Sequence, residues 1–128
     1  MNGKRFFLDT NAVVQLLSGN TELLNTPEGA AYVATSVICE LEFLSFSGLS
    51  EKDRQLFQSF LARISVVDVC TGDIQLKKRI QDFRREKKLK LPDAVIAASA
   101  AVHACLLVTA DKHLLKIPGL AVQGYHAC

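Results

Sequence analysis

The stretch Phe6-Phe7-Leu8-Asp9-Thr10-Asn11 decides the fold class of this chain, together with the apolar residues 12–17 that follow it. Three apolar residues predict a short strand, and the segment after Asn11 has the composition of a helix. Asp9 or Thr10 stands between them, where a side-chain oxygen can cap the start of the helix. The chain therefore begins with a strand, a turn and a helix, which is the start of an α/β arrangement.

The same alternation of strand and helix continues along the chain. Apolar runs predict further strands at 32–35, 65–69, 106–108 and 120–122. Helices are predicted at 37–46, from 51, from about 73, at 94–104 and from 111 to about 117. Short strands that alternate with helices predict an α/β fold, a three-layer sandwich with a mostly parallel central sheet. With 128 residues, the chain fits one domain over residues 1–128.

Composition narrows the class of protein. Hydrophobic residues make up 49% of the sequence, enough to fill one core without disulfides or structural metal. Cys39, Cys70, Cys105 and Cys128 lie far apart, and no two have the spacing of a zinc site. We therefore expect a reducing compartment and a cytoplasmic location. No apolar run is long enough for a signal peptide or a membrane span, so we expect no membrane partner.

The basic residues are concentrated in one segment. Residues 77–90 hold eight lysines and arginines against Asp82 and Glu86, whereas the whole chain has a net charge of only +2. A basic segment on an otherwise acidic chain is one way in which proteins contact nucleic acid. Taken alone, such a run is more often a solvated helix face.

Four acidic residues differ from the others in their surroundings. Asp9 ends the first strand, Asp93 opens the Ala-rich helix, and Asp111 follows the strand at 106–108. In a parallel sheet the carboxyl ends of the strands and the helix starts after them face one crevice. Glu40 lies in an apolar helical segment, where a charge needs a partner or an ion, and it can reach the same place.

The four carboxylates would repel one another unless a cation neutralised them. Oxygen ligands without histidine or cysteine suit Mg²⁺ or Mn²⁺ better than zinc. Such a site can activate water and stabilise the charge of a phosphodiester during in-line attack. The pattern therefore predicts a metal-dependent nuclease whose catalytic and metal-binding residues are Asp9, Glu40, Asp93 and Asp111.

Each of these acids also has an ordinary structural explanation. Asp111 can be a helix N-cap, Asp93 can complement the helix dipole, and Asp9 can belong to a turn. Glu40 can lie at the rim of a half-exposed helix, with Glu42 as an equally plausible inward residue. Spacing alone does not separate these explanations.

Four short motifs, in order along the chain, resemble those of the PIN-domain family, in particular the VapC-type toxins of bacterial toxin–antitoxin pairs. They are Leu8-Asp9-Thr10-Asn11, Ser36-Val37-Ile38-Cys39-Glu40-Leu41, Leu91-Pro92-Asp93-Ala94-Val95-Ile96-Ala97-Ala98 and Leu107-Val108-Thr109-Ala110-Asp111-Lys112. The resemblance covers nearly the whole chain. It implies a PIN-like fold and an endoribonuclease that cleaves RNA at an acidic Mg²⁺ or Mn²⁺ site.

The resemblance also implies residue roles and partners. The four acids match the family's acidic positions, and Asn11 and Thr109 match polar positions that support the site. A homodimer and inhibition by a cognate antitoxin, whose tail lies across the active cleft, are implied as well. The chain departs from the family pattern at Ala110, where arginine is frequent, and at His113-Leu114, where Asp-Phe is frequent. These departures bear on the contacts with RNA and on the fourth ligand.

Two other functions remain open on the sequence. A PIN-like domain that has lost catalysis could bind RNA or a protein partner, although the presence of all four acids argues against it. A receiver-like signalling domain has a similar length and an acidic pocket, with Asp68 and Thr109 as its candidate residues. Receivers place paired acids after the first strand, where this chain has Thr10-Asn11, so this alternative is the weaker one.

Overall fold

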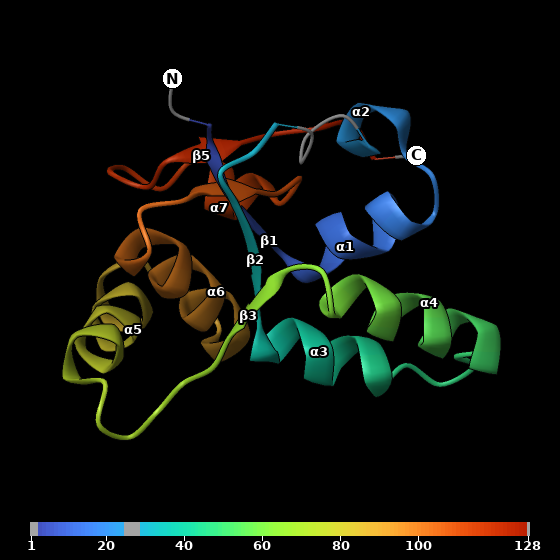
Figure 1. Ribbon diagram of the computed structural model, residues 1–128. Coiled ribbons are helices and arrows are strands. Elements are labelled where there is room, and N and C mark those ends of the chain that lie inside the picture. Colours follow the sequence, from blue (N-terminus) through green and yellow to red (C-terminus); the bar gives the residue numbers. More distant parts are fainter. Residues whose placement is uncertain (1–2, 25–28, 128) are drawn as a thin grey trace.

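The computed structural model describes residues 3–24 and 29–127 of the chain. Within these residues, strands alternate with helices in the predicted order (Figure 1). The strands are β1 (Arg5–Leu8), β2 (Tyr32–Ser36), β3 (Ser65–Val67), β4 (Leu106–Val108) and β5 (Val122–Gln123). The helices are α1 (Thr10–Leu17), α2 (Thr21–Leu24), α3 (Val37–Leu44), α4 (Glu51–Leu61), α5 (Ile74–Glu86), α6 (Leu91–Val102) and α7 (Lys112–Leu115). Cys128 lies outside the described residues.

The strands form one parallel sheet in the order β3-β2-β1-β4-β5. At its centre Phe7 of β1 is level with Ala34 of β2 on one side and Leu107 of β4 on the other. From β1 the chain moves outward to β2, and from β4 it moves outward in the opposite direction to β5. The switch point of the sheet, where open α/β folds bind ligands, therefore lies between the carboxyl ends of β1 and β4.

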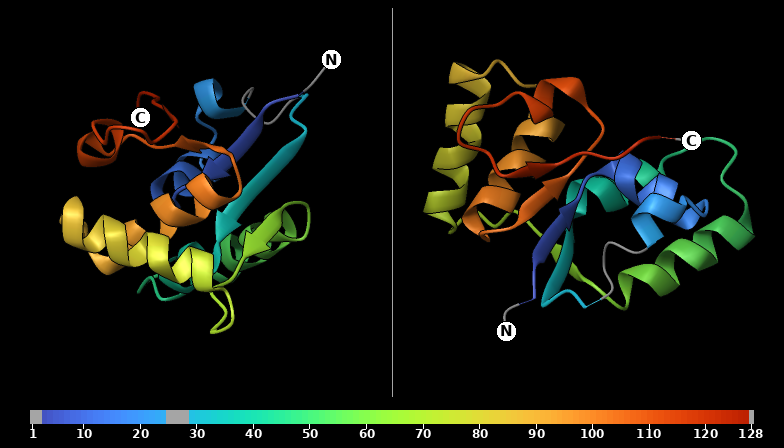
Figure 2. Two further views of the ribbon diagram at one scale, coloured as in Figure 1. Left: turned by 90° about the vertical axis from the view of Figure 1, so that its left-hand side faces the viewer. Right: turned by 90° about the horizontal axis from the view of Figure 1, so that it is seen from above.

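Helices cover both faces of the sheet, as Figures 1 and 2 show. Because side chains alternate along a strand, Phe6 and Leu8 point to one face and Phe7 to the other. Phe6 and Leu8 pack in a core with α1, α3 and α4, which contribute the fully buried Cys39 and Phe57. Phe7 packs in a second core with α5 and α6. The predicted three-layer α/β sandwich with a parallel central sheet is confirmed.

Side chains at the ends of strands start several of the helices. The side-chain oxygens of Asp9, Ser36 and Asp111 accept hydrogen bonds from backbone N–H groups in the first turns of α1, α3 and α7. These caps satisfy donors that have no partner within the helix. Helix α6 begins earlier than predicted, because Pro92 fits its first turn. Asp93 therefore lies inside that first turn.

Helix α3 and strand β3 both end earlier than predicted. Helix α3 ends at Leu44, because Ser45 takes the C-cap position and the chain then turns toward Gly48, whose φ of 92° is left-handed. Strand β3 ends at Val67, which pairs with Ser36. Beyond Ser36 its partner β2 has become α3, so the residues after Val67 have no strand to pair with.

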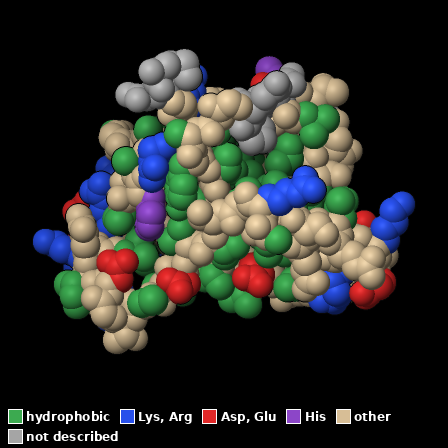
Figure 3. Space-filling model, viewed as in Figure 1, with side chains coloured by type: hydrophobic (Ala, Val, Ile, Leu, Met, Phe, Trp, Pro, Cys, Tyr) green, Lys and Arg blue, Asp and Glu red, His purple; other side chains and the backbone are tan. Residues whose placement is uncertain are grey.

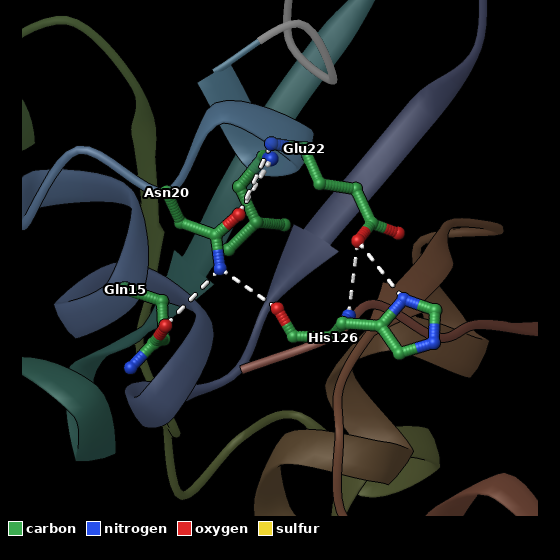
Figure 4. Close-up of polar contacts among 5 residues, drawn as sticks. Gln15, Asn20, Glu22 and His126 are labelled. Carbon is green, nitrogen blue, oxygen red and sulfur yellow. Dashed lines mark hydrogen bonds and ion pairs between the residues drawn. The ribbon is translucent and has the colours of Figure 1, made fainter. Parts of the chain in front are cut away.

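A polar cluster holds the C-terminal segment against α1 and α2 (Figure 4). Asn20 is buried, and its Nδ2 donates to Gln15 Oε1 at 3.1 Å and to the carbonyl oxygen of His126 at 2.9 Å. The backbone N–H of His126 donates to Glu22 Oε1 at 3.0 Å. The chain from β5 to His126 is therefore held across α1 and the start of α2.

The surface is mixed in charge and carries several exposed apolar side chains. On the face in Figure 3, acidic side chains lie along the lower part, and lysines and arginines lie mainly to the left and right. Leu41, Phe46 and Ile74 are among the large hydrophobic residues that remain exposed. No helix among the described residues is long and apolar enough to cross a membrane.

Candidate active site

A cavity of about 460 Å³ lies at the switch point of the sheet, and carboxylates line it. Asp9 follows β1 directly, Asp111 comes shortly after β4, and Asp93 lies in the first turn of α6. All three line the cavity, together with Glu42 from α3 and Asp53 from α4. Three of the four acidic residues predicted from the sequence therefore lie on the wall of one cavity.

Asp9 is held in place on both of its carboxylate oxygens. It is 6% exposed, its Oδ1 accepts from the backbone N–H of Ala12 at 2.8 Å, and its Oδ2 accepts from Thr109 Oγ1 at 2.5 Å. Thr109 Oγ1 in turn accepts from the backbone N–H of Asp111 at 3.0 Å. Thr109 therefore connects the ends of β1 and β4.

The ionised form of Asp9 is disfavoured by its surroundings. Burial is the largest effect and raises the pKa of Asp9 above its ordinary value of 3.8, while the hydrogen bonds from Thr109 and Ala12 lower it. The negative charges of Asp111 and Asp93 raise this pKa further. The hydrogen bonds do not fully compensate the charge, so the site holds negative charge that lacks a counterion.

The negative charge of Asp93, which also lines the cavity, is likewise not fully compensated. Burial raises the pKa of Asp93, and the charges of Asp111 and Glu42 raise it further. Lys90 and His113 act in the opposite direction and lower it. Perturbed carboxylates of this kind, placed together in a cavity, are typical of functional sites.

Asp111 combines a structural role with a place in the site. Its Oδ1 accepts from the backbone N–H of His113 at 2.8 Å and caps α7. The same residue lines the cavity and raises the pKa of Asp9 and Asp93. The capping explanation and the functional explanation for Asp111 are therefore compatible.

Glu42, and not Glu40, is the glutamate that faces the cavity. Glu40 is half-buried and does not line it, whereas Glu42 does, and Thr10 Oγ1 donates to Glu42 Oε1 at 2.5 Å. Glu40 was expected to reach the site, but the structure places it outside the cavity. The reason is helix geometry, since residues three and four apart share a face. Cys39, Glu42 and Phe43 lie on one side of α3, and Glu40 points about 200° away from Glu42.

Asn11, Thr10 and Asp53 are further polar residues that line the cavity. Of these, Asn11 is exposed. From the sequence, Thr10 was considered only as a helix cap, and Asp53 was assigned no role in the site. The signal for Thr10 was its position beside Asp9, whereas nothing in the sequence near Asp53 distinguishes it from a first-turn acid.

Apolar side chains also line the cavity. Most come from α1, α3, α4 and the turn between the last two: Val14, Leu17, Phe43, Phe46, Leu49 and Leu56. Phe46 is 70% exposed and Leu56 48% exposed, whereas Phe43 stacks on the buried Phe57 with ring centroids 3.9 Å apart. Carboxylates and apolar side chains therefore share one opening.

The donor set on the acidic side has the chemistry of a site for a hard divalent cation. All ionisable side chains that line the cavity are carboxylates, the ligands that Mg²⁺ and Mn²⁺ prefer. The raised pKa values of Asp9 and Asp93 show where positive charge would be stabilising. As the side chains stand, no three acidic, histidine or cysteine groups among the described residues converge into a preformed metal cluster.

Tyr125 lies close to this site, and sequence motifs did not point to it. It follows β5, is 9% exposed, and packs in the core beneath α1. Its hydroxyl is buried without a hydrogen-bond partner among the described residues. Burial raises the pKa of Tyr125 to about 12, and the charge of Asp9 adds to the effect. The phenol is therefore a protonated donor within the electrostatic reach of Asp9.

Asp68, the candidate residue of a receiver-like domain, lies elsewhere. It is exposed, follows the edge strand β3, and accepts a hydrogen bond from Cys70 Sγ at 3.3 Å. It does not line the cavity. The cavity therefore gives no support to the receiver-like assignment of Asp68.

Comparison with known proteins identifies the family. The sequence matches the family model of the PIN domain over residues 6–120, and no curated protein matches it. A toxin–antitoxin complex from Klebsiella pneumoniae is similar at 28% identity, with a TM-score of 0.75 over 91% of this chain and 94% of that chain. VapBC2 from Rickettsia felis, bound to a DNA fragment from its promoter, is similar at 23% identity, with a TM-score of 0.80 over 94% and 98%.

A third similar structure, VapBC-1 from nontypeable Haemophilus influenzae, has 18% identity and a TM-score of 0.75 over 93% of this chain and 96% of that chain. All three structures come from toxin–antitoxin pairs, in agreement with the expected resemblance to VapC-type toxins. The matched residues 6–120 include the four aspartates that line the cavity. This chain belongs to the PIN-domain family.

Proposed function

We propose that this protein is a Mg²⁺- or Mn²⁺-dependent endoribonuclease and the toxin of a toxin–antitoxin pair. The observation that carries the proposal is the cavity at the switch point of a PIN-domain sheet, whose ionisable lining consists of carboxylates. Two of them, Asp9 and Asp93, have raised pKa values. A cation that binds there would offset this repulsion and meet the phosphate of a substrate in the same place.

The residues of the site would have different roles in catalysis. Asp9, Asp93 and Asp111 would hold the ion, and Asp9 keeps acceptor capacity because each of its oxygens accepts only one hydrogen bond. When bound, the ion polarises the scissile phosphate and lowers the pKa of water. Glu42, oriented by the hydroxyl of Thr10, takes the place expected for Glu40 and positions the attacking water. Thr109 and Asn11 support this arrangement.

The lining of the cavity suggests two partners. Its carboxylates would act on RNA, whereas its apolar side chains would accept apolar side chains from the tail of a cognate antitoxin. The similar structures from Klebsiella and Rickettsia are toxin–antitoxin complexes, which supports an antitoxin as the partner. A homodimer is proposed from the family resemblance. We place the protein in the cytoplasm, where the described cysteines Cys39, Cys70 and Cys105 would remain the free thiols that they are here.

Cleavage of structured RNA by the wild-type chain and by Asp9→Asn tests the nuclease. With Mn²⁺ present, Asp9→Asn should lose at least about 100-fold in rate, because changes even behind the direct metal ligands cost 10- to 100-fold. The matched control is Asp68→Asn, which removes the same charge from an exposed residue outside the cavity and should cleave like wild type. Cleavage that survives either Asp9→Asn or chelation of the metal contradicts the proposal.

The main alternative is a PIN domain that binds without cleaving. It is favoured by the absence of a preformed cluster of three metal-binding groups among the described side chains. A wild-type chain that cleaves neither RNA nor DNA with Mg²⁺ or Mn²⁺, yet forms a tight complex with its antitoxin, would establish this alternative.

A further inference from the structure

The cavity contains no cationic side chain to balance its acids. Asp9, Glu42, Asp53, Asp93 and Asp111 line it, and no lysine, arginine or histidine among the described residues does. A nucleic-acid strand carries a negative charge at every phosphate, and phosphate contacts from basic side chains supply much of the affinity of such complexes. The phosphates on either side of the bond to be cleaved must therefore be held by basic groups at the rim.

Basic residues lie beside the acids where α6 and α7 begin. Helices α1 and α3, which form part of its wall, contain no lysine or arginine. On α4, Arg54 pairs with Glu51. Across the cavity, Lys90 is the N-cap residue of α6 and His113 lies in the short helix α7. Asp93 follows Lys90 by three residues in the first turn of α6, and the N–H of His113 donates to Asp111 Oδ1, so both residues lie beside acids of the cavity.

The local backbone holds both residues in place. Lys90 follows the buried Leu89, whose N–H donates to the carbonyl oxygen of Phe83 at 3.4 Å, and the carbonyl oxygen of Lys90 accepts from Ala94 at 2.9 Å. The N–H of His113 donates to Asp111 Oδ1 at 2.8 Å. Neither residue forms an ion pair within the described part of the chain. Both side chains are exposed, so their polar ends are available to a ligand.

Other cations of the basic segment are occupied or lie elsewhere. Lys77 Nζ donates to the carbonyl oxygen of Thr71 at 3.1 Å, and Arg85 pairs with Asp82 at 3.1 Å. Lys78 is exposed in the second turn of α5, beside a different hollow of the surface. The basic residues at 77–90 therefore do not form one uniform surface facing the cavity.

We propose that Lys90 and His113 form a rim that binds the RNA phosphates next to the scissile one, so that the RNA backbone enters the cavity from the side of α6 and α7. The inference rests on the proposed function, because it takes RNA as the substrate of the same cavity. It assigns the contact with the substrate backbone to two particular residues rather than to the basic segment as a whole.

Salt-dependent binding tests the rim without requiring cleavage. A single-stranded RNA oligonucleotide is titrated with wild-type chain, Lys90→Gln and Lys78→Gln in the presence of a chelator, at several salt concentrations. Removal of one phosphate contact lowers the slope of log affinity against log salt by about 0.7 for a single strand. We expect this loss in Lys90→Gln and none in Lys78→Gln, which removes the same charge from an exposed site on α5.

His113→Gln is the second variant, because it leaves the backbone cap of Asp111 intact. It should weaken binding about threefold, as expected for loss of one hydrogen bond to the substrate. Thermal unfolding at a temperature close to that of wild type would show that each variant is folded. A wild-type slope in Lys90→Gln, or an equal loss of slope in Lys78→Gln, overturns the rim while the cleavage test of Asp9→Asn still stands. If the wild-type chain binds no RNA at all, both the rim and the proposed substrate are wrong.

Discussion

Asp9 serves folding and the proposed chemistry at the same time. One oxygen caps α1 through the N–H of Ala12, and the other accepts from Thr109, whose hydroxyl also accepts from the N–H of Asp111. Hydrogen bonds to an ionised acceptor are stronger than neutral ones, and they offset part of the cost of burying this carboxylate. The remaining cost is visible in the raised pKa of Asp9. A residue kept at such a cost is better explained by function than by capping alone.

Tyr125 allows a test of the packing near Asp9 at the scale of a single residue. Its hydroxyl is buried without a partner among the described residues, and an unmade hydrogen bond of this kind costs about 1–3 kcal/mol. We predict that Tyr125→Phe raises the free energy of unfolding by about 1 kcal/mol, measured by urea denaturation. Ser99→Ala is the matched control, since the hydroxyl of Ser99 on α6 is buried and unpartnered in the same way. A loss of stability in Tyr125→Phe alone would contradict the prediction and indicate that a bound water satisfies the phenol.

At the scale of the element, α3 offers two glutamates in nearly the same sequence context, and only one of them faces the cavity. We predict that Glu42→Gln lowers RNA cleavage or metal affinity about 10- to 100-fold, because the hydroxyl of Thr10 orients this carboxylate toward the site. Glu40→Gln should change either quantity no more than about twofold, as is usual for substitutions away from such contacts. The measurement is the rate of cleavage at several Mn²⁺ concentrations. The opposite ranking of the two variants would restore the assignment to Glu40.

The elements also show which parts of the structure the sequence can predict. The strands were predictable because short apolar runs alternate with capping residues, and Asp9, Asp93 and Asp111 followed from their places at strand ends and helix starts. Glu42 could be named only as an alternative to Glu40, because apolar neighbours in sequence do not show which side of a helix faces inward, and that side is set by the packing of α3 against α1. Tyr125 could not be found, since its proximity to Asp9 depends on the path of the C-terminal segment.

At the scale of the whole molecule, the fold places an excess of negative charge at one edge of the sheet. The central strands deliver carboxylates to that edge, while two cores on opposite faces of the sheet hold the strands in place. The hydrogen bond from Asn20 to the carbonyl oxygen of His126 holds the C-terminal segment beside α1 and α2. The fold therefore maintains mutually repelling groups in one place, and the whole protein should gain stability when their charge is removed or neutralised.

Stability should accordingly fall as the pH rises through the range in which Asp9 and Asp93 ionise. Both have a pKa in the folded state above the ordinary value of 3.8, so the folded chain binds more protons than the unfolded chain over that interval. Their contribution to stability is therefore fully present below pH 3.8 and is lost as the pH rises through the folded-state values. Asp9→Asn removes one of these ionisations, and its amide can still accept from Ala12. We predict that this variant is more stable than wild type at neutral pH and that the difference shrinks below pH 4, as measured by urea denaturation at each pH.

Divalent cations should reverse that order, because an ion that binds only the folded chain stabilises it by mass action. At a concentration about 100 times the dissociation constant, Mg²⁺ or Mn²⁺ would add about 2.7 kcal/mol to the free energy of unfolding of wild type. Asp9→Asn, which lacks one of the proposed ligands, should gain much less, and Asp68→Asn should gain as much as wild type because Asp68 lies outside the cavity. Equal gains in Asp9→Asn and wild type would show that the ion binds elsewhere on the chain. A stabilisation confined to chains with intact Asp9 would place the ion at the same edge of the sheet where the fold concentrates its negative charge.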